Sequence, residues 1–131
     1  MREIVLAVAV VALPVVPALL VDLDGAPETV AGRSAVPALS PAGTRGEAVF
    51  RRHCADCHGR LAQGGAAGPS LLQPVYAAPG YPDAAFRAAI REGAPARLWS
   101  FGPMPPSPGI PAAQMDALIA YVRDLQRASG L

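Results

Sequence analysis

The chain has 131 residues, of which 52% are hydrophobic, and its formal net charge is +1. Arginine supplies all 11 of its Lys and Arg positions, and no basic run exceeds two residues, which argues against a nucleic-acid-binding surface. The length indicates one domain, and the 15 prolines and 13 glycines predict long irregular connections between few helices.

Residues 1–21 form an apolar segment, and residues 4–21 carry no charge. As a helix this uncharged run would be about 27 Å long, close to the thickness of a bilayer core. Two interpretations stay open: an uncleaved membrane anchor with Arg2 on the cytoplasmic side, or a signal peptide cleaved after Ala18. Both place the rest of the chain on the periplasmic side of the cytoplasmic membrane, either anchored or exported.

Residues 22–43 are rich in proline, glycine and alanine and are predicted to be a flexible linker. A linker favours the anchor, because it would let a membrane-held domain reach its partners. Residues 44–131 are predicted to be the folded domain. A domain of this size has a small apolar core, so a bound apolar group would supply much of its interior.

The first helix of this domain is predicted to begin at Thr44 and to run to about Cys54. Thr44 and Glu47 match the Thr-x-x-Glu capping box, which satisfies free N–H groups at a helix start. Phe50, Cys54 and Cys57 then fall on one helical face.

Residues 54–58 read Cys-Ala-Asp-Cys-His, which matches C-x-x-C-H, the attachment signature of a c-type haem. The thiols of Cys54 and Cys57 would add across the two vinyl groups of haem, and His58 would become an axial ligand of the iron. A structural zinc site normally has four ligands, and the only other histidine of the chain is His53. A zinc ion bound by the two cysteines and two histidines would hold only residues 53–58 together, so a zinc site is disfavoured. No strand pattern supports a thioredoxin-like site. The motif therefore predicts one covalent haem c.

Residues 59–82 are predicted to be a long loop that the haem orders, with Pro69 and Leu71 against the porphyrin on the His58 side. A second helix is predicted from Pro82 to about Glu92, since proline suits a helix start and a glycine follows the end.

Met104 lies among prolines and glycines in residues 94–110, a segment that cannot be helical and whose backbone proline holds rigidly. A thioether on such a segment can reach iron from the side opposite His58, so Met104 is predicted to be the second axial ligand. Arg97 and Trp99 precede it, and either could donate a hydrogen bond to a haem propionate.

A third helix is predicted from about Pro111 to Arg127. Met115 falls at helical spacing with Leu118 and Val122, so it is predicted to be a core residue and not a ligand. Arg123 is expected to favour the negative C-terminal end of this helix.

These motifs resemble the class I c-type cytochromes, the small single-haem bacterial kind, over roughly residues 44–128. The resemblance rests on Gly46, Phe50, Cys54, Cys57, His58, Gly59, Gly68, Pro69, Leu71, Gly102, Met104, Pro105 and Tyr121. It implies an all-α cytochrome c fold, with three main helices and long loops around one covalent haem.

The resemblance also implies that the terminal helices cross where Gly46 and Tyr121 meet. It further implies that the Pro69 carbonyl accepts a hydrogen bond from the ring of His58, which would orient that ligand. The chain departs from the lysine-rich members of the family, because it contains no lysine.

The sequence thus predicts a one-electron carrier with His58 and Met104 as axial ligands, and not an enzyme. Its expected partners are redox proteins or a membrane electron-transport complex, with the membrane reached through the N-terminal helix if that helix is retained. Two alternatives stay open. The domain could be a fixed subunit of a larger membrane redox complex, or, if Met104 does not bind the iron, an open-site haem sensor or peroxidase.

Overall fold

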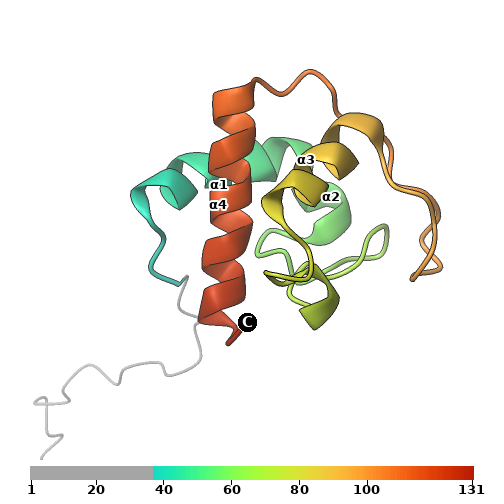
Figure 1. Cartoon of the computed structure of the whole chain (residues 1–131), viewed down its shortest axis with the longest axis horizontal. Coiled ribbons are helices and arrows are strands. Elements are labelled where there is room, and N and C mark those ends of the chain that lie inside the picture. Colours follow the sequence, from blue (N-terminus) through green and yellow to red (C-terminus); the bar gives the residue numbers. More distant parts are fainter. Residues whose placement is uncertain (1–36) are drawn as a thin grey trace, which may run out of the picture. The chain divides into compact units, whose positions relative to one another are not determined.

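The computed structural model describes residues 37–131, which fold into helices joined by long loops (Figure 1). In chain order the elements are α1 (Pro41–His53), α2 (Ala55–His58), the 3-10 turn η1 (Pro74–Tyr76), α3 (Asp83–Glu92) and α4 (Ala112–Ala128). The predicted all-α fold with three main helices is confirmed. The apolar segment 1–21 lies outside the described residues, as does the predicted linker up to residue 36. Within residues 37–131, no helix has both the length and the apolar character needed to cross a membrane.

Helix α1 begins at Pro41, three residues before the predicted start, so the last part of the predicted linker is helical. Its N-cap is Ser40, whose hydroxyl oxygen accepts a hydrogen bond from the Gly43 N–H at 3.0 Å. Thr44 is already inside the helix and donates from its hydroxyl to the Ser40 carbonyl at 3.1 Å. The predicted capping box of Thr44 and Glu47 is therefore wrong, because serine followed by proline offers an earlier start.

The start of α1 is fixed to α4 through Asp124. The backbone N–H and the hydroxyl of Ser40 both donate to one carboxylate oxygen of Asp124, each at 2.8 Å. Asp124 is buried, and Arg127 donates to its other oxygen. Gly43 leaves room for this carboxylate, since a Cβ at that position would lie 1.9 Å from it.

Helices α1 and α4 cross, as expected, and form the most extensive contact between elements of the described domain (Figure 1). At the crossing Gly46 lies against the backbone of Ala117, where a Cβ would be 1.8 Å from the Ala117 carbonyl oxygen. One turn further along both helices, Tyr121 packs on Phe50 with ring centroids 5.3 Å apart. The Tyr121 hydroxyl donates to the Arg60 carbonyl at 2.9 Å.

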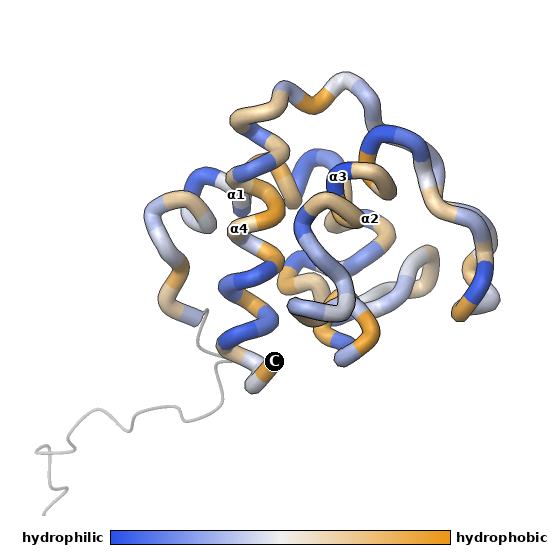
Figure 2. Tube along the Cα trace, in the orientation of Figure 1, coloured by the Kyte–Doolittle hydropathy of each residue, from blue (hydrophilic) through white to orange (hydrophobic). Residues whose placement is uncertain are grey.

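Helix α4 is amphipathic, with hydrophobic residues spread along it between hydrophilic ones (Figure 2). Met115, Leu118 and Val122 are buried in the core, as their spacing predicts. From α3, Phe86 and Ile90 join the same core. The core thus occupies the space between α1, α3 and α4, and the long connections of the chain close over it.

Candidate functional site

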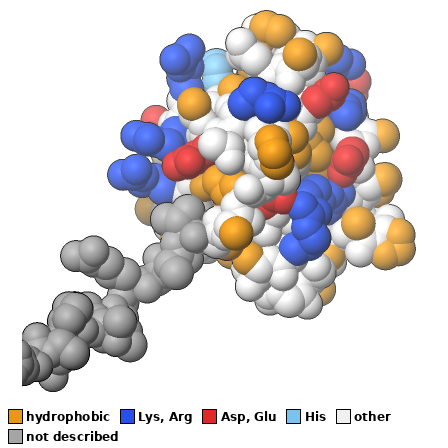
Figure 3. All heavy atoms as spheres, turned by 90° about the vertical axis from the view of Figure 1, so that its left-hand side faces the viewer, with side chains coloured by type: hydrophobic (Ala, Val, Ile, Leu, Met, Phe, Trp, Pro, Cys, Tyr) orange, Lys and Arg blue, Asp and Glu red, His pale blue; other side chains and the backbone are white. Residues whose placement is uncertain are grey.

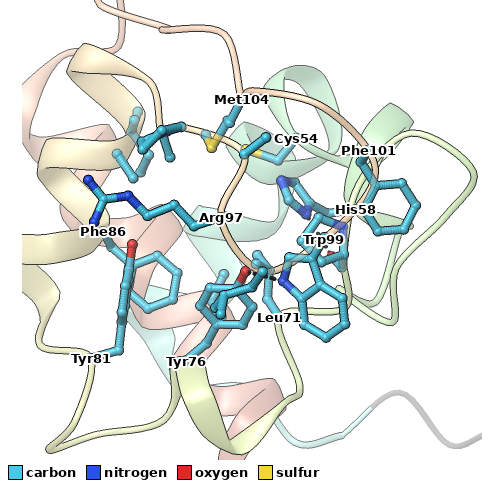
Figure 4. Close-up of a pocket in the computed structure, with 18 of the residues that line it drawn as sticks. Cys54, His58, Leu71, Tyr76, Tyr81, Phe86, Arg97, Trp99, Phe101 and Met104 are labelled. Atoms are coloured by element: carbon cyan, nitrogen blue, oxygen red, sulfur yellow. Dashed lines mark hydrogen bonds between the residues drawn. The ribbon is translucent and has the colours of Figure 1, made fainter.

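A cavity of about 310 Å³ lies beside the core, between the ends of α1 and α2, the inner face of α3, α4, and the segment between α3 and α4 (Figure 4). A smaller cavity of about 90 Å³ adjoins it and shares Cys54, His58 and Met104 among its walls. The larger cavity is lined mostly by apolar side chains. They come from Phe50, Pro69, Leu71, Phe86, Ala89, Ile90, Leu98, Trp99, Phe101, Leu118 and Val122.

His58 lies at the end of α2, is buried, and faces both cavities. Its Nδ1 is 2.8 Å from the Pro69 carbonyl oxygen, which is the hydrogen bond that the resemblance implies. A carbonyl oxygen only accepts, so Nδ1 must carry the proton. In the neutral imidazole Nε2 then carries no proton, and its lone pair is available for a metal.

The two cysteines lie on the same side of the site as His58. Cys54 lines both cavities, while Cys57 lines the smaller one. Burial, and to a smaller extent the neighbouring Cys57, raise the pKa of the Cys54 thiol to about 12. Cys54 is therefore a neutral thiol at physiological pH. A free metal ion binds the thiolate and not the neutral thiol. A neutral, partly buried thiol in an apolar wall is therefore better suited to form a covalent bond with an apolar group.

The loop after the motif closes tightly around it. The Gly64 N–H donates to the His58 carbonyl at 2.7 Å. A Cβ at Gly65 or at Gly68 would lie 2.9 or 3.0 Å from the Cys57 carbonyl oxygen. This close approach of backbone to backbone explains why the loop is rich in glycine.

Met104 lines both cavities and comes from a segment far along the chain from His58. Its backbone forms an isolated antiparallel bridge with Ala94, with N–H to oxygen distances of 2.8 and 3.1 Å. The Ser107 N–H donates to the Ile90 carbonyl at 2.6 Å, which ties the segment to α3 a second time. The backbone of Met104 is therefore fixed against the C-terminal end of α3.

Gly93 makes that attachment possible. It ends α3 with a φ of +82°, in the left-handed region that favours glycine. A Cβ at Gly93 would lie 2.6 Å from the Met104 carbonyl oxygen. The helix cap and the position of Met104 thus depend on one residue.

Arg97 and Trp99 are both exposed and lie at the mouth of the larger cavity (Figure 4). The Trp99 indole N–H donates to the Tyr76 hydroxyl at 2.8 Å, a partner that the sequence did not predict. Tyr81 packs edge-on against Tyr76, with centroids 5.4 Å apart, and also lines the cavity. Burial raises the pKa of Tyr81, and its neighbour Tyr76 raises it further, so this phenol stays neutral at physiological pH.

Sequence reasoning also missed two residues behind the cavity wall. Arg123 donates to the carbonyl oxygens of Tyr76 and Tyr81, and Gln126 donates to the Leu71 carbonyl at 2.8 Å. Arg123 was expected only to favour the end of its helix. The spacing of Arg123 and Gln126 places them on one face of α4, but nothing local in the sequence identifies their distant carbonyl partners.

A family model described as cytochrome c matches residues 43–126, more than half of the chain. The chain belongs to the cytochrome c family. Members of this family bind a covalent haem c and are electron carriers, so haem c is the cofactor of this chain. Comparison with curated proteins gave no match, and comparison with solved structures gave none either.

The described side chains fit that cofactor. The walls are apolar, and Cys54 and Cys57 lie next to a histidine whose Nε2 is free to bind iron. The Met104 thioether lies on a rigid segment that lines the same cavities. The site of this chain therefore contains residues of the kind that can hold a covalent haem c.

Proposed function

We propose that this protein is a one-electron carrier in which Cys54 and Cys57 hold the haem through thioether bonds, and His58 and Met104 are the two axial ligands. When bound, the haem supplies the Fe(II)/Fe(III) couple. The observation that carries the proposal is the hydrogen bond between His58 Nδ1 and the Pro69 carbonyl, because it leaves Nε2 as the ring nitrogen of this cavity-lining histidine that can bind iron.

The remaining roles of the chain are to exclude water and to hold geometry. Phe50, Leu71 and Phe86 form apolar walls, which keep the polarity around the cofactor low. Low polarity and a methionine ligand both favour the reduced state and therefore a higher potential. Rigid ligands also help electron transfer, because little rearrangement accompanies the change in oxidation state.

At the cavity mouth, Arg97 and the Trp99–Tyr76 pair are the proposed donors to the haem propionates. Trp99 already donates to the Tyr76 hydroxyl. A tyrosine hydroxyl that accepts one hydrogen bond still has its own proton to donate, so Tyr76 extends the predicted pair. In Figure 4 the Arg97 side chain extends toward the side of the cavity that carries Tyr81 and Phe86.

Redox proteins are the proposed partners, docking through a small transient interface near the cavity mouth. The exposed side chains there include Leu98, Trp99 and Phe101. On the face shown in Figure 3, which is the left-hand side of Figure 1 and not the side of residues 94–104, arginine and acidic side chains are interspersed. The proposal also places the domain on the periplasmic side of the membrane, with residues 1–21 as its anchor. The apolar sequence of residues 1–21 supports this location.

An open-site sensor or peroxidase is less well supported. Peroxide chemistry needs an acid–base group beside the iron. No carboxylate lines either cavity among the described residues, and His53 is exposed on the smaller cavity, on the side of the cysteines.

A potentiometric titration of the haem-loaded protein, followed by its optical spectrum, tests the proposed function. We expect one reversible one-electron step, and a reduced protein that does not bind carbon monoxide. A high-spin oxidised spectrum, together with rapid carbon monoxide binding after reduction, would instead assign an open iron and refute the carrier.

Gly93→Ala should weaken the proposed methionine ligation without changing either ligand. The new Cβ would press on the Met104 carbonyl and would also strain the left-handed backbone of the cap. We expect a weaker methionine-to-iron absorption band and a lower potential. Gly130→Ala is the control for backbone strain, because Gly130 has a φ of +85°, lines neither cavity, and its Cβ would meet nothing within 4 Å. Equal effects in both variants would attribute the change to backbone strain alone.

A further inference from the structure

Residues 71–82 form one wall of the larger cavity, to which Leu71, Tyr76 and Tyr81 contribute side chains. This wall segment contains only one 3-10 turn. Two side chains of α4 hold its backbone. Arg123 and Gln126 together donate hydrogen bonds to three of its carbonyl oxygens.

Arg123 makes the larger share of these contacts. Besides binding two wall carbonyls, its guanidinium donates to an oxygen of Asp83 at 2.9 Å and to the Gln126 side-chain oxygen at 2.7 Å. The same group lies over the Phe86 ring, with its central carbon 4.9 Å from the ring centroid. Only a planar fork of donors can satisfy these partners at once, and a lysine ammonium cannot.

The guanidinium also places a permanent charge close to the cavity. The Arg123 side chain is only 11% exposed, whereas the Asp83 carboxylate that pairs with it is 54% exposed and open to screening by water. Phe86 lines the cavity, so a single ring separates the Arg123 charge from it. A positive charge behind a wall of low polarity opposes the extra positive charge of an oxidised centre.

We propose that Arg123 is a positioning residue of the haem crevice with two effects. It holds the wall segment 71–82 on α4, and its charge raises the reduction potential of the haem. This inference rests on the proposed electron-carrier function and adds to it a residue that does not itself contact the cavity.

The electrostatic effect is tested by potentiometric titration of four haem-loaded proteins: wild type, Arg123→Met, Arg123→Lys and Arg87→Met. Arg87 is the matched control, since it joins α3 to α4 through Asp116 but contacts no wall carbonyl. We expect the lowest potential in Arg123→Met, a smaller decrease in Arg123→Lys, and little change in Arg87→Met. Equal shifts in the two Arg123 variants, or an equal shift in Arg87→Met, would overturn the electrostatic effect.

A second pair of variants tests the same electrostatic effect and keeps Arg123 in place, so the test remains possible if Arg123→Met does not fold. Asp83→Asn leaves the Arg123 charge unpaired and should raise the potential. Asp116→Asn is its control, because both carboxylates pair with an arginine and their exposed fractions are similar, 54% and 58%. If Asp83→Asn does not raise the potential above that of Asp116→Asn, the electrostatic effect is refuted.

The positioning effect is tested separately by hydrogen exchange of the same proteins. We expect faster exchange in residues 71–82 of Arg123→Lys than in wild type, with α1 unchanged. Unchanged exchange in the wall segment would overturn this effect. A wild type without a reversible redox step would refute the carrier function, whereas the exchange comparison would still decide whether Arg123 holds the wall.

Discussion

Replacing Met104 by leucine is expected to abolish the weak far-red absorption band that marks methionine bound to oxidised haem iron, and to lower the reduction potential. Leucine has nearly the volume of methionine but no atom that can bind iron. Axial ligands set haem potentials over a range of about 0.8 V, so we expect this to be the largest redox effect of any single substitution considered for the chain. The measurement is a potentiometric titration with optical spectra of both oxidation states.

The chain provides a matched control in Met115→Leu. Met115 is fully buried in α4 and lines neither cavity. A swap that conserves volume in the core costs less than about 1.5 kcal/mol, and it should leave the spectrum and the potential unchanged. Retention of the far-red band in Met104→Leu would show that Met104 is not the ligand.

Gly46→Ala is expected to cause the largest loss of stability. Its methyl carbon would lie 1.8 Å from the Ala117 carbonyl oxygen and 2.3 Å from the carbonyl carbon, both of which are backbone atoms of α4. Because backbone cannot move aside as a side chain can, α1 and α4 must separate where they cross. We expect the free energy of unfolding to fall by about 3 kcal/mol, at the upper end of the range for overpacked cores.

Denaturant unfolding of the haem-loaded protein, followed by far-ultraviolet circular dichroism, measures this loss. Gly109→Ala introduces the same methyl group where a Cβ meets nothing within 4 Å, and it should change stability by less than about 0.5 kcal/mol. Similar unfolding midpoints for both alanine variants would show that the helices adjust to the added carbon without cost.

Local chemistry made most of the cofactor site predictable from the sequence. The motif of residues 54–58 places two thiols and an imidazole within two turns of chain, so their proximity requires no knowledge of the fold. Met104 was predicted to be a ligand because prolines and glycines exclude a helix around it. The structure brings Met104 to the cavities that His58 lines, as expected.

Contacts between distant segments were not predictable in the same way. The start of α1 was misplaced because Ser40 and Thr44 are both good caps, and the partner that favours Ser40 is Asp124 on the last helix. Likewise, arginine at position 123 looks like any charge near a helix end. Its role depends on two carbonyls in a loop more than forty residues earlier.

The attachment of Ser40 to Asp124 has a mechanical consequence. It joins the beginning of the described domain to the last turns of α4, so the two ends of the domain share one anchoring point. A pull transmitted through the chain before Pro37 would load these hydrogen bonds and the crossing of α1 with α4. The bridge between Met104 and Ala94 is not among these contacts. We therefore expect a pull on the chain before Pro37 to leave the position of Met104 unchanged.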